Sequence, residues 1–166
     1  MENILFIEKQ QFRHPWIWVL LIGLCLLTLW GFIQQIVLGI PWGSNPAPDG
    51  LLLFITILPF ALLWLFGVMC LKTEITNEEI RVSFFPFFSR SFQWEDIEEA
   101  YVRQYRPLAE YGGWGVRFSP KGMAYNVSGK MGLQLVLKKG KKRILIGTQL
   151  SDELQRVVNL IHPFVK

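Results

Sequence analysis

Hydrophobic positions form two long, uninterrupted runs in the first half of the chain, at residues 16–40 and 51–71. Between residues 14 and 71 only one side chain is charged, Asp49, and it lies in the turn-rich segment between the two runs. A charge buried in hydrocarbon costs a few kcal/mol or more, and about 20 helical residues cross a hydrocarbon core of ~30 Å. The pattern therefore predicts two transmembrane helices.

Lysine and arginine are distributed unevenly around these runs. Lys9 and Arg13 precede the first run, Lys72 follows the second, and residues 41–50 contain neither type. Because positive side chains favour the cytoplasmic side, we expect both termini there, in a multi-pass protein of the bacterial cytoplasmic membrane. The predicted order is a cytoplasmic segment (1–15), a first helix (16–40), an extracytoplasmic loop (41–50), a second helix (51–71) and a cytoplasmic domain (72–166).

The pattern changes after Leu71 to short alternating segments separated by turn residues. Ile80, Val82 and Phe84 alternate with polar side chains across residues 79–85, which is typical of a half-buried strand. Further strands are predicted at residues 72–76, 89–93, 100–105, 114–119, 133–138 and 142–146, with a helical turn at 94–99 and a loop at 106–113.

The end of the chain has helical spacing instead. Leu154, Val157, Val158 and Ile161 recur on one helix face after Ser151, and a helix there should end before Pro163. About seven strands and one terminal helix predict a membrane-anchored α+β protein. Its polar part should be a small β-barrel or sandwich with the C-terminal α-helix across one end.

Three segments of the polar half carry a family resemblance: TEIT, FQWEDIEEAYV and ILIGTQLSDELQRVV. Together, over residues 72–166, they resemble the bacterial pleckstrin-homology-like (PH-like) domains of small membrane proteins. The segments YGGWGVRF and AYNVSG also resemble those of uncharacterised bacterial membrane proteins. The first hairpin, residues 76–79, is acidic, whereas eukaryotic lipid-binding members of this fold place Lys and Arg there. We therefore expect no phosphoinositide binding at that hairpin.

The charge of the polar half limits its partners. All but two of the 17 Lys and Arg residues follow Leu71, and so do all but three of the 13 Asp and Glu residues. This part of the chain therefore has a net charge of +5. This mild excess suits the anionic surface of a lipid bilayer. The basic residues form no stripe interleaved with aromatic side chains, so we expect no nucleic-acid partner.

A glycine-rich loop is the first candidate binding site. It contains Tyr111, Gly112, Gly113, Trp114 and Arg117. Glycine lets the backbone approach another surface closely, and Trp, Tyr and Arg are favoured at binding hot spots. We expect this loop to bind an unknown protein partner or a second copy of the chain. The alternative is a glycine-rich beginning of a strand, with Trp114 in the core.

Two further clusters are candidates for lipid contact. One is a basic hairpin that contains Lys138, Lys139, Lys141, Lys142 and Arg143, and its alternative interpretation is a solvated hairpin. The other is a phenylalanine turn around Pro86 that contains Phe85, Phe87 and Phe88. The strand before this turn leads back toward the membrane, so we expect the turn at the bilayer surface. The alternative is that these rings fill the core.

The sequence contains no arrangement that implies catalysis. His14 and His162 have no obvious partner, the acids of residues 95–99 suit a solvated turn, and Cys25 and Cys70 lack metal-ligand spacing. We therefore expect no enzyme activity, no cofactor and no metal. Turnover that required Glu110 or His162 would contradict this expectation.

We expect the chain to act as a membrane-anchored binding or scaffolding module. It would engage a protein partner or its own oligomer, with secondary contact to anionic lipid. The alternative is an accessory or assembly subunit of a transporter or envelope enzyme. Such a subunit would act through its helices, at Gln34, Gln35 and the region of Pro59.

Overall fold

The computed structural model describes residues 4–161, so His162 and Pro163 lie outside the described residues. The chain divides into two compact units. One unit is continuous, Arg13–Val68, and the other combines the segment that ends at Phe12 with the segment that begins at Met69. The second unit is therefore built from both ends of the chain.

The continuous unit is a pair of apolar helices. Helix α1 (Pro15–Phe32) continues as a π-helical turn, η1 (Ile33–Val37), and α2 (Asp49–Val68) follows a loop. Both are long and apolar enough to cross a membrane, and most of their side chains are exposed. Thr56 Oγ1 donates a hydrogen bond to the carbonyl oxygen of Thr28 across the pair, at 3.3 Å. These bounds agree closely with the two predicted runs.

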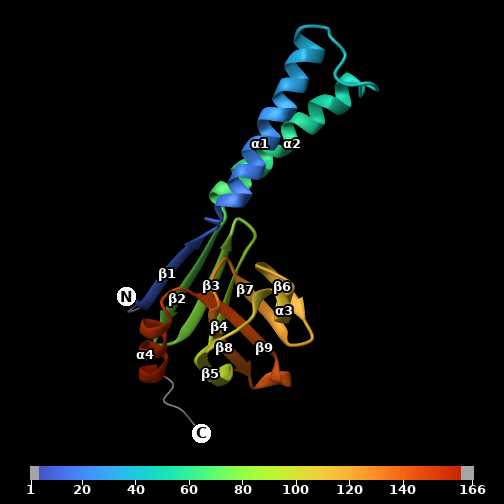
Figure 1. Cartoon of the computed structure of the whole chain (residues 1–166). Coiled ribbons are helices and arrows are strands. Elements are labelled where there is room, and N and C mark those ends of the chain that lie inside the picture. The colour runs from blue at the N-terminus through green and yellow to red at the C-terminus, as the bar shows by residue number, and fades with distance from the viewer. Residues whose placement is uncertain (1–3, 162–166) are drawn as a thin grey trace. The chain divides into compact units, whose positions relative to one another are not determined.

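The first sheet of the polar unit, sheet A, contains strands in the order β1-β2-β3-β4, all antiparallel (Figure 1). The strands are β1 (Ile4–Gln11), β2 (Cys70–Thr76), β3 (Glu79–Phe85) and β4 (Phe88–Gln93). Strand β1 precedes the two helices in the chain, and β2 follows them. The helices are thus inserted into what would otherwise be a β1–β2 hairpin.

The register fixes what lies at the two ends of sheet A. Gln11 pairs with Cys70, and Cys70 pairs with Phe85. We call this end the linker end, because α1 begins at Pro15 and α2 ends at Val68, just beyond the paired residues. At the opposite end, the turn after Thr76 connects β2 to β3.

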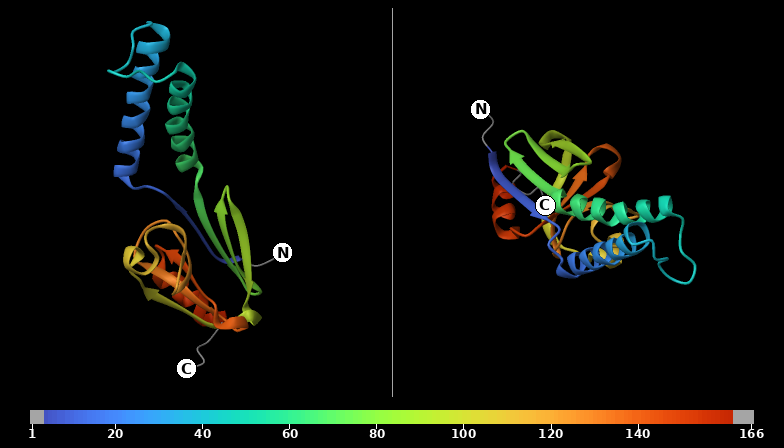
Figure 2. Two further views of the ribbon diagram at one scale, coloured as in Figure 1. Left: turned by 90° about the vertical axis from the view of Figure 1, so that its right-hand side faces the viewer. Right: turned by 90° about the horizontal axis from the view of Figure 1, so that it is seen from above.

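The second sheet, sheet B, has the strand order β5-β8-β9-β7-β6. Its strands are β5 (Ile97–Gln104), β6 (Gly115–Ser119), β7 (Gly122–Asn126), β8 (Met131–Leu137) and β9 (Arg143–Thr148). The β7–β9 pair is parallel, and the other pairs are antiparallel. Short helices η2 (Trp94–Asp96), α3 (Pro107–Tyr111) and η3 (Lys139–Lys141) lie in the connections. Figure 2 shows the sheets as two separate layers.

The core of the polar unit lies between the sheets and under helix α4 (Ser151–Ile161). The apolar face of α4 buries Leu154, Val157 and Val158 and packs on β5, β8 and β1. The rest of this core is made of apolar side chains of the strands, including Ile75, Ile80, Val82, Leu133, Leu135 and Ile146. The predicted terminal helix is therefore present, and its apolar face is buried.

The predicted barrel is wrong, because both sheets are open and no strand of one pairs with a strand of the other among residues 4–161. Side chains join the sheets instead. Gln10 Nε2 donates to the carbonyl oxygen of Gly147 at 2.7 Å, and the buried Glu8 carboxylate accepts hydrogen bonds from Thr148 Oγ1 and the Gln149 amide. The described residues also contain nine strands rather than about seven, since β1 and β7 were not predicted.

Candidate functional site

The glycine-rich loop begins with a short helix where the sequence predicted an irregular loop. Pro107 occupies the first turn of α3, where its missing N–H costs no hydrogen bond. Gly112 ends the helix in the left-handed conformation, with φ 72°. Its amide donates to Leu108, and the Gly113 amide donates to Pro107, each at 3.0 Å, which satisfies the last carbonyl oxygens. The glycines therefore have a capping role in this loop.

An ionic network holds α3 against β5. Arg103 on β5 donates to Glu110 Oε2 at 3.0 Å and to Gln134 Oε1 at 3.0 Å. Glu110 Oε1 also accepts the Arg106 backbone amide at 2.9 Å, and Lys121 lies 3.8 Å from Oε2. The carboxylate thus joins the beginning of the helix to β5 and to the β6–β7 turn.

The network shifts the pKa values of its members. Burial alone would raise the pKa of Glu110, but the Arg103 hydrogen bond, the Arg106 amide and the positive charges of Arg103 and Lys121 lower it. Burial alone would lower the pKa of Arg103, but Glu110 raises it above its ordinary value. Both groups are therefore charged at neutral pH.

Beneath α3 lies a small second core, made of Tyr105, Tyr111, Ala124 and Leu145. The Tyr105 and Tyr111 rings meet edge to face, with centroids 6.1 Å apart. Tyr111, which we predicted to contact a partner, is only 4% exposed, and its hydroxyl lies 3.4 Å from Arg103 Nη2. Its ring therefore fixes α3 to the sheet and is not presented at the surface.

Trp114 and Arg117 lie on the outer side of this loop. Arg117 Nε donates to the carbonyl oxygen of Trp114 at 2.9 Å, so the side chain folds back over Gly113. A Cβ atom at Gly113 would lie 3.5 Å from the guanidinium, and its φ of 132° is one that other residues rarely adopt. Trp114 is half-buried and Arg117 is exposed. Of the predicted loop residues, these two offer side chains to another molecule.

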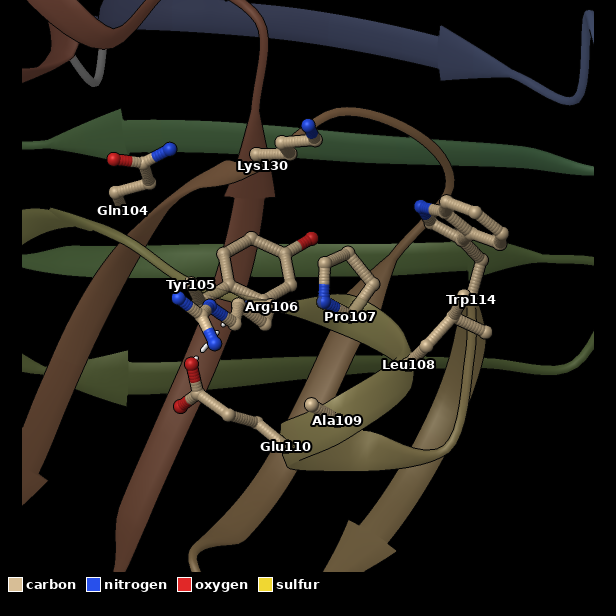
Figure 3. Close-up of a pocket in the computed structure, with 9 residues that line it drawn as sticks. All are labelled: Gln104, Tyr105, Arg106, Pro107, Leu108, Ala109, Glu110, Trp114 and Lys130. Atoms are coloured by element: carbon tan, nitrogen blue, oxygen red, sulfur yellow. Dashed lines mark hydrogen bonds between the residues drawn. The ribbon is translucent and has the colours of Figure 1, made fainter.

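A pocket of about 700 Å³ opens beside α3 (Figure 3). Its apolar wall contains Trp114, Pro107 and Leu108, and Leu108 is 68% exposed. Arg106 and Lys130 also line it, and neither forms an ion pair within the described part of the chain. The pocket therefore combines an apolar surface with two cations that have no acidic partner.

The Tyr105 hydroxyl is a buried polar group at this pocket. A Cβ atom on Gly147 would lie 3.5 Å from its oxygen. In Figure 3 it points toward the side on which Lys130 and Trp114 lie. Burial raises the pKa of Tyr105, and a side-chain hydrogen bond with Asn126 opposes this effect. The hydroxyl is therefore neutral at pH 7, with Asn126 as its neighbour.

The three phenylalanines predicted to face lipid separate into two groups. Phe85 and Phe87 are 60% and 57% exposed, and the β2–β3 register places their turn at the linker end. Phe88 is half-buried and packs on Tyr125 and Phe84, with ring centroids 5.3 and 6.0 Å apart. Phe87 also stacks on Phe84, with ring centroids 5.9 Å apart, but more than half of its surface remains exposed.

The basic hairpin lies at the opposite end of the polar unit from the linker end. The Lys138 amide donates to Asp96 O and its Nζ to Glu95 O. The neighbouring Trp94 amide donates to Glu78, in the β2–β3 turn. Lys139, Lys141, Lys142 and Arg143 are exposed there, beside the acids of residues 95–99. The two clusters predicted to face lipid therefore lie at different ends of the polar unit.

Sequence reasoning missed Leu108 and Lys130 as site residues. Lys130 reaches the pocket only because its carbonyl oxygen accepts the Tyr105 amide, a contact that no local pattern reveals. Leu108 was placed in an irregular loop. Pro107 followed by a glycine pair five residues later is a helix start and stop signal that would have identified α3.

The two helices use their polar side chains within their own unit. Gln35 Nε2 donates to Ala47 O at 2.7 Å and to Asp49 Oδ1 at 2.8 Å, and Gln34 Nε2 lies 3.4 Å from Pro41 O. Among the described residues, no three His, Cys, Asp or Glu side chains are grouped to hold a metal ion. No model of a known protein family matches the chain, and no curated protein matches it significantly.

Proposed function

We propose that this protein is a membrane-anchored binding module, with α1 and α2 across a bilayer and the polar unit on the cytoplasmic side. The hydropathy of both helices supports the membrane location. Lys9, Arg13 and Lys72 beside the helices support the cytoplasmic orientation. The β1–β2 pairing supports a common side for the residues that precede α1 and follow α2, because the paired strands belong to one sheet.

The observation that carries this proposal is the pocket beside Trp114. Its lining combines a half-buried indole, an exposed leucine and two cations that form no ion pair with the residues that the structure describes. Binding sites typically combine an apolar lining with a few polar groups that fix the orientation of the ligand. The ionic network around Glu110 supports a preformed site, because it holds α3 in place without a ligand.

We further propose that the phenylalanine turn rests on the bilayer surface. Phe85 pairs with Cys70, which follows the end of α2 by two residues. Exposed aromatic rings so close to a membrane-spanning segment suit the interface between water and hydrocarbon. Phe85 and Phe87 would then hold the polar unit against the bilayer, and the basic hairpin has no part in this contact.

Binding suits the site better than catalysis. Glu110, the acid considered for a catalytic role, is held ionised by Arg103 and the Arg106 amide, which supports a structural role. A subunit that acts through its helices receives less support, since Gln34 and Gln35 bond within the helical unit. The PH-like resemblance remains part of the proposal, supported by the first antiparallel sheet and the C-terminal helix α4.

Site-directed photocrosslinking tests the binding site. A benzoylphenylalanine at Leu108 in the full-length chain should form an adduct with the bound molecule in native membranes, identified by mass spectrometry. The matched control is the same group at Ser91, an exposed residue of β4 that does not line the pocket. Equal labelling from both positions, or none from Leu108, would contradict a binding site at α3.

A further inference from the structure

A second, smaller pocket lies beside α3 on sheet B and has a volume of about 280 Å³. Every side chain in its lining ends in a polar or charged group: Tyr101, Arg103, Glu110, Lys121, Gln134 and Arg143. All six belong to the polar unit, so the pocket is complete without the two helices. Pockets for drug-sized ligands have about 300–1,000 Å³ and a mostly apolar lining. This pocket therefore suits a small, polar ligand.

The fold brings two cations of this pocket close together. Lys121 lies in the β6–β7 turn, and Arg143 begins β9. The parallel register of β7 and β9 pairs Met123 with Ile144, which places Gly122 beside Arg143. A Cβ atom on Gly122 would overlap the Arg143 carbonyl oxygen, and its φ of 120° is one that other residues rarely adopt. Glycine at this position therefore lets the turn that carries Lys121 approach the beginning of β9.

The charges of this lining do not balance. Glu110 Oε2 accepts Arg103 at 3.0 Å, so this carboxylate already has a cationic partner. Lys121 Nζ lies 3.8 Å from the same oxygen, beyond hydrogen-bond distance, and Arg143 forms no ion pair among residues 4–161. Three cations and one carboxylate give the lining an excess of two positive charges. Because like charges held together repel each other, an anion between Lys121 and Arg143 would stabilise this arrangement.

Hydrogen bonds fix the third cation at the base of the pocket. Arg103 Nε donates to Gln134 Oε1 at 3.0 Å. Gln134 is buried, and its Nε2 lies 3.2 Å from the carbonyl oxygens of Leu135 and Ile144. Tyr101 pairs with Gln134 across the β5–β8 register and adds a hydroxyl to the lining. The pocket thus combines a fixed guanidinium with the exposed cations of Lys121 and Arg143 above it.

From the repelling pair, the polar lining and the fixed base we propose that this pocket binds a phosphate group, either as the free ion or as the phosphomonoester of a small soluble molecule. Lys121 and Arg143 hold its oxygens through charge-assisted hydrogen bonds, and the Tyr101 hydroxyl donates to a third oxygen. A phosphomonoester has a charge of about −1.5 to −2 at pH 7, which matches the excess charge of the lining. The site is distinct from the pocket beside Trp114, although Glu110 lines both.

The test is isothermal titration calorimetry of the full-length chain in mild detergent at constant ionic strength. Inorganic phosphate and glycerol 3-phosphate should each bind at least about tenfold more tightly than acetate, which has a single charge. Lys121→Gln with Arg143→Gln should weaken phosphate binding at least about tenfold. The control, Arg106→Gln with Lys130→Gln, removes the same residue types from the pocket beside Trp114 and should keep the affinity within about twofold. Near-ultraviolet circular dichroism confirms that each variant is folded.

Two results would overturn the proposal. One is phosphate binding that survives in the variant of Lys121 and Arg143, and the other is a wild type that binds phosphate no better than acetate. The two phosphate probes identify the source of the anion: tighter glycerol 3-phosphate supports an ester, and tighter inorganic phosphate supports the free ion. The Leu108 crosslinker reports only on the pocket beside Trp114, so failure of this proposal would leave the binding module standing.

Discussion

Glu110 shows how a single side chain can hold a short surface helix in place. Its carboxylate receives Arg103 from β5 and the Arg106 amide at the beginning of α3, and it lies near Lys121 beyond β6. Because these groups favour the charged form, the pKa of Glu110 is lowered. A lowered pKa in the folded state stabilises the protein at pH values above the ordinary carboxylate pKa, and this stabilisation is lost as the pH falls through the folded-state value.

Glu110→Gln should therefore lower the free energy of unfolding at pH 7 by about 1 kcal/mol, a value kept small because the network is partly solvated. The difference from the wild type should shrink as the pH falls below about 4. Thermal unfolding of the full-length chain in mild detergent measures both effects. The control is Glu99→Gln, an exposed position on β5. A difference that is constant with pH would show that the charge of Glu110 is not its source.

At this scale the sequence predicted the residues that local chemistry reveals. Gly112, Gly113 and Trp114 follow α3 in one turn, and Arg117 of β6 donates back to the carbonyl oxygen of Trp114. Tyr111 was misplaced because an aromatic beside two glycines looks the same in sequence whether it faces solvent or the Tyr105 ring. Lys130 could not be predicted, since only the pairing of its carbonyl with Tyr105 brings it to the site.

At the scale of the elements, the phenylalanine turn contains both packed and exposed phenylalanine rings. Phe88 begins β4 and packs on Tyr125, whereas Phe85 and Phe87 are exposed on the turn itself. Successive side chains of β3 point to opposite faces of the sheet, so Phe84 points inward and Phe85 lies on the outer face. Buried and exposed phenylalanines therefore lie within five residues of each other.

Substitutions in this turn should behave unequally. Phe88→Ser should lower the free energy of unfolding by about 3 kcal/mol, because it removes a packed ring. Phe85→Ser should change it by less than about 1 kcal/mol. Contact with lipid is measured separately, with a nitroxide at position 87 of a cysteine-free chain in nanodiscs. Dissolved molecular oxygen should increase the spin-relaxation rate of this label more than a water-soluble nickel complex does. A label as open to nickel as one at Ser91 would refute the bilayer contact.

The strands show where the alternation of apolar and polar side chains is enough to predict a strand. Residues 79–85 form β3 as predicted, because alternation with one face buried fixes both type and bounds. Strand β1 also alternates, yet its inward positions include Glu8 and Gln10, which are buried because Thr148, Gln149 and Gly147 bond to them. A buried polar side chain is satisfied only by the tertiary structure, so the pattern of β1 was not recognised as a strand.

For the molecule as a whole, the main feature is that the polar unit is discontinuous. The domain predicted at residues 72–166 lacks the segment that ends at Phe12, in which Phe6 of β1 and Phe12 are buried. Phe12 meets Phe84 edge to face at 6.3 Å. Without β1, one edge of β2 and part of the core would be exposed to water, so the N-terminal segment is a structural part of the domain.

The unit should become an independent, soluble protein when the helices are replaced by a tight turn. An Asn-Gly pair in place of residues 13–68 would connect Phe12 to Met69, directly beyond the Gln11–Cys70 pair, and would suit a type I′ hairpin. We expect a cooperative thermal transition by circular dichroism. Residues 72–166 alone should show none, or a much lower midpoint. Equal midpoints for the two proteins would show that β1 is dispensable.

The interrupted hairpin also sets an order of events during synthesis. Strand β1 leaves the ribosome first, but its partner β2 begins 59 residues later, after both apolar helices, counting from Gln11 to Cys70. At about 5–20 residues per second, the first strand waits for roughly 3–12 seconds before it can pair. During this interval β1 must stay on the side where β2 will emerge. If α1 and α2 cross a membrane as proposed, sheet A can be completed only in chains whose β1 and β2 lie on the same side of it.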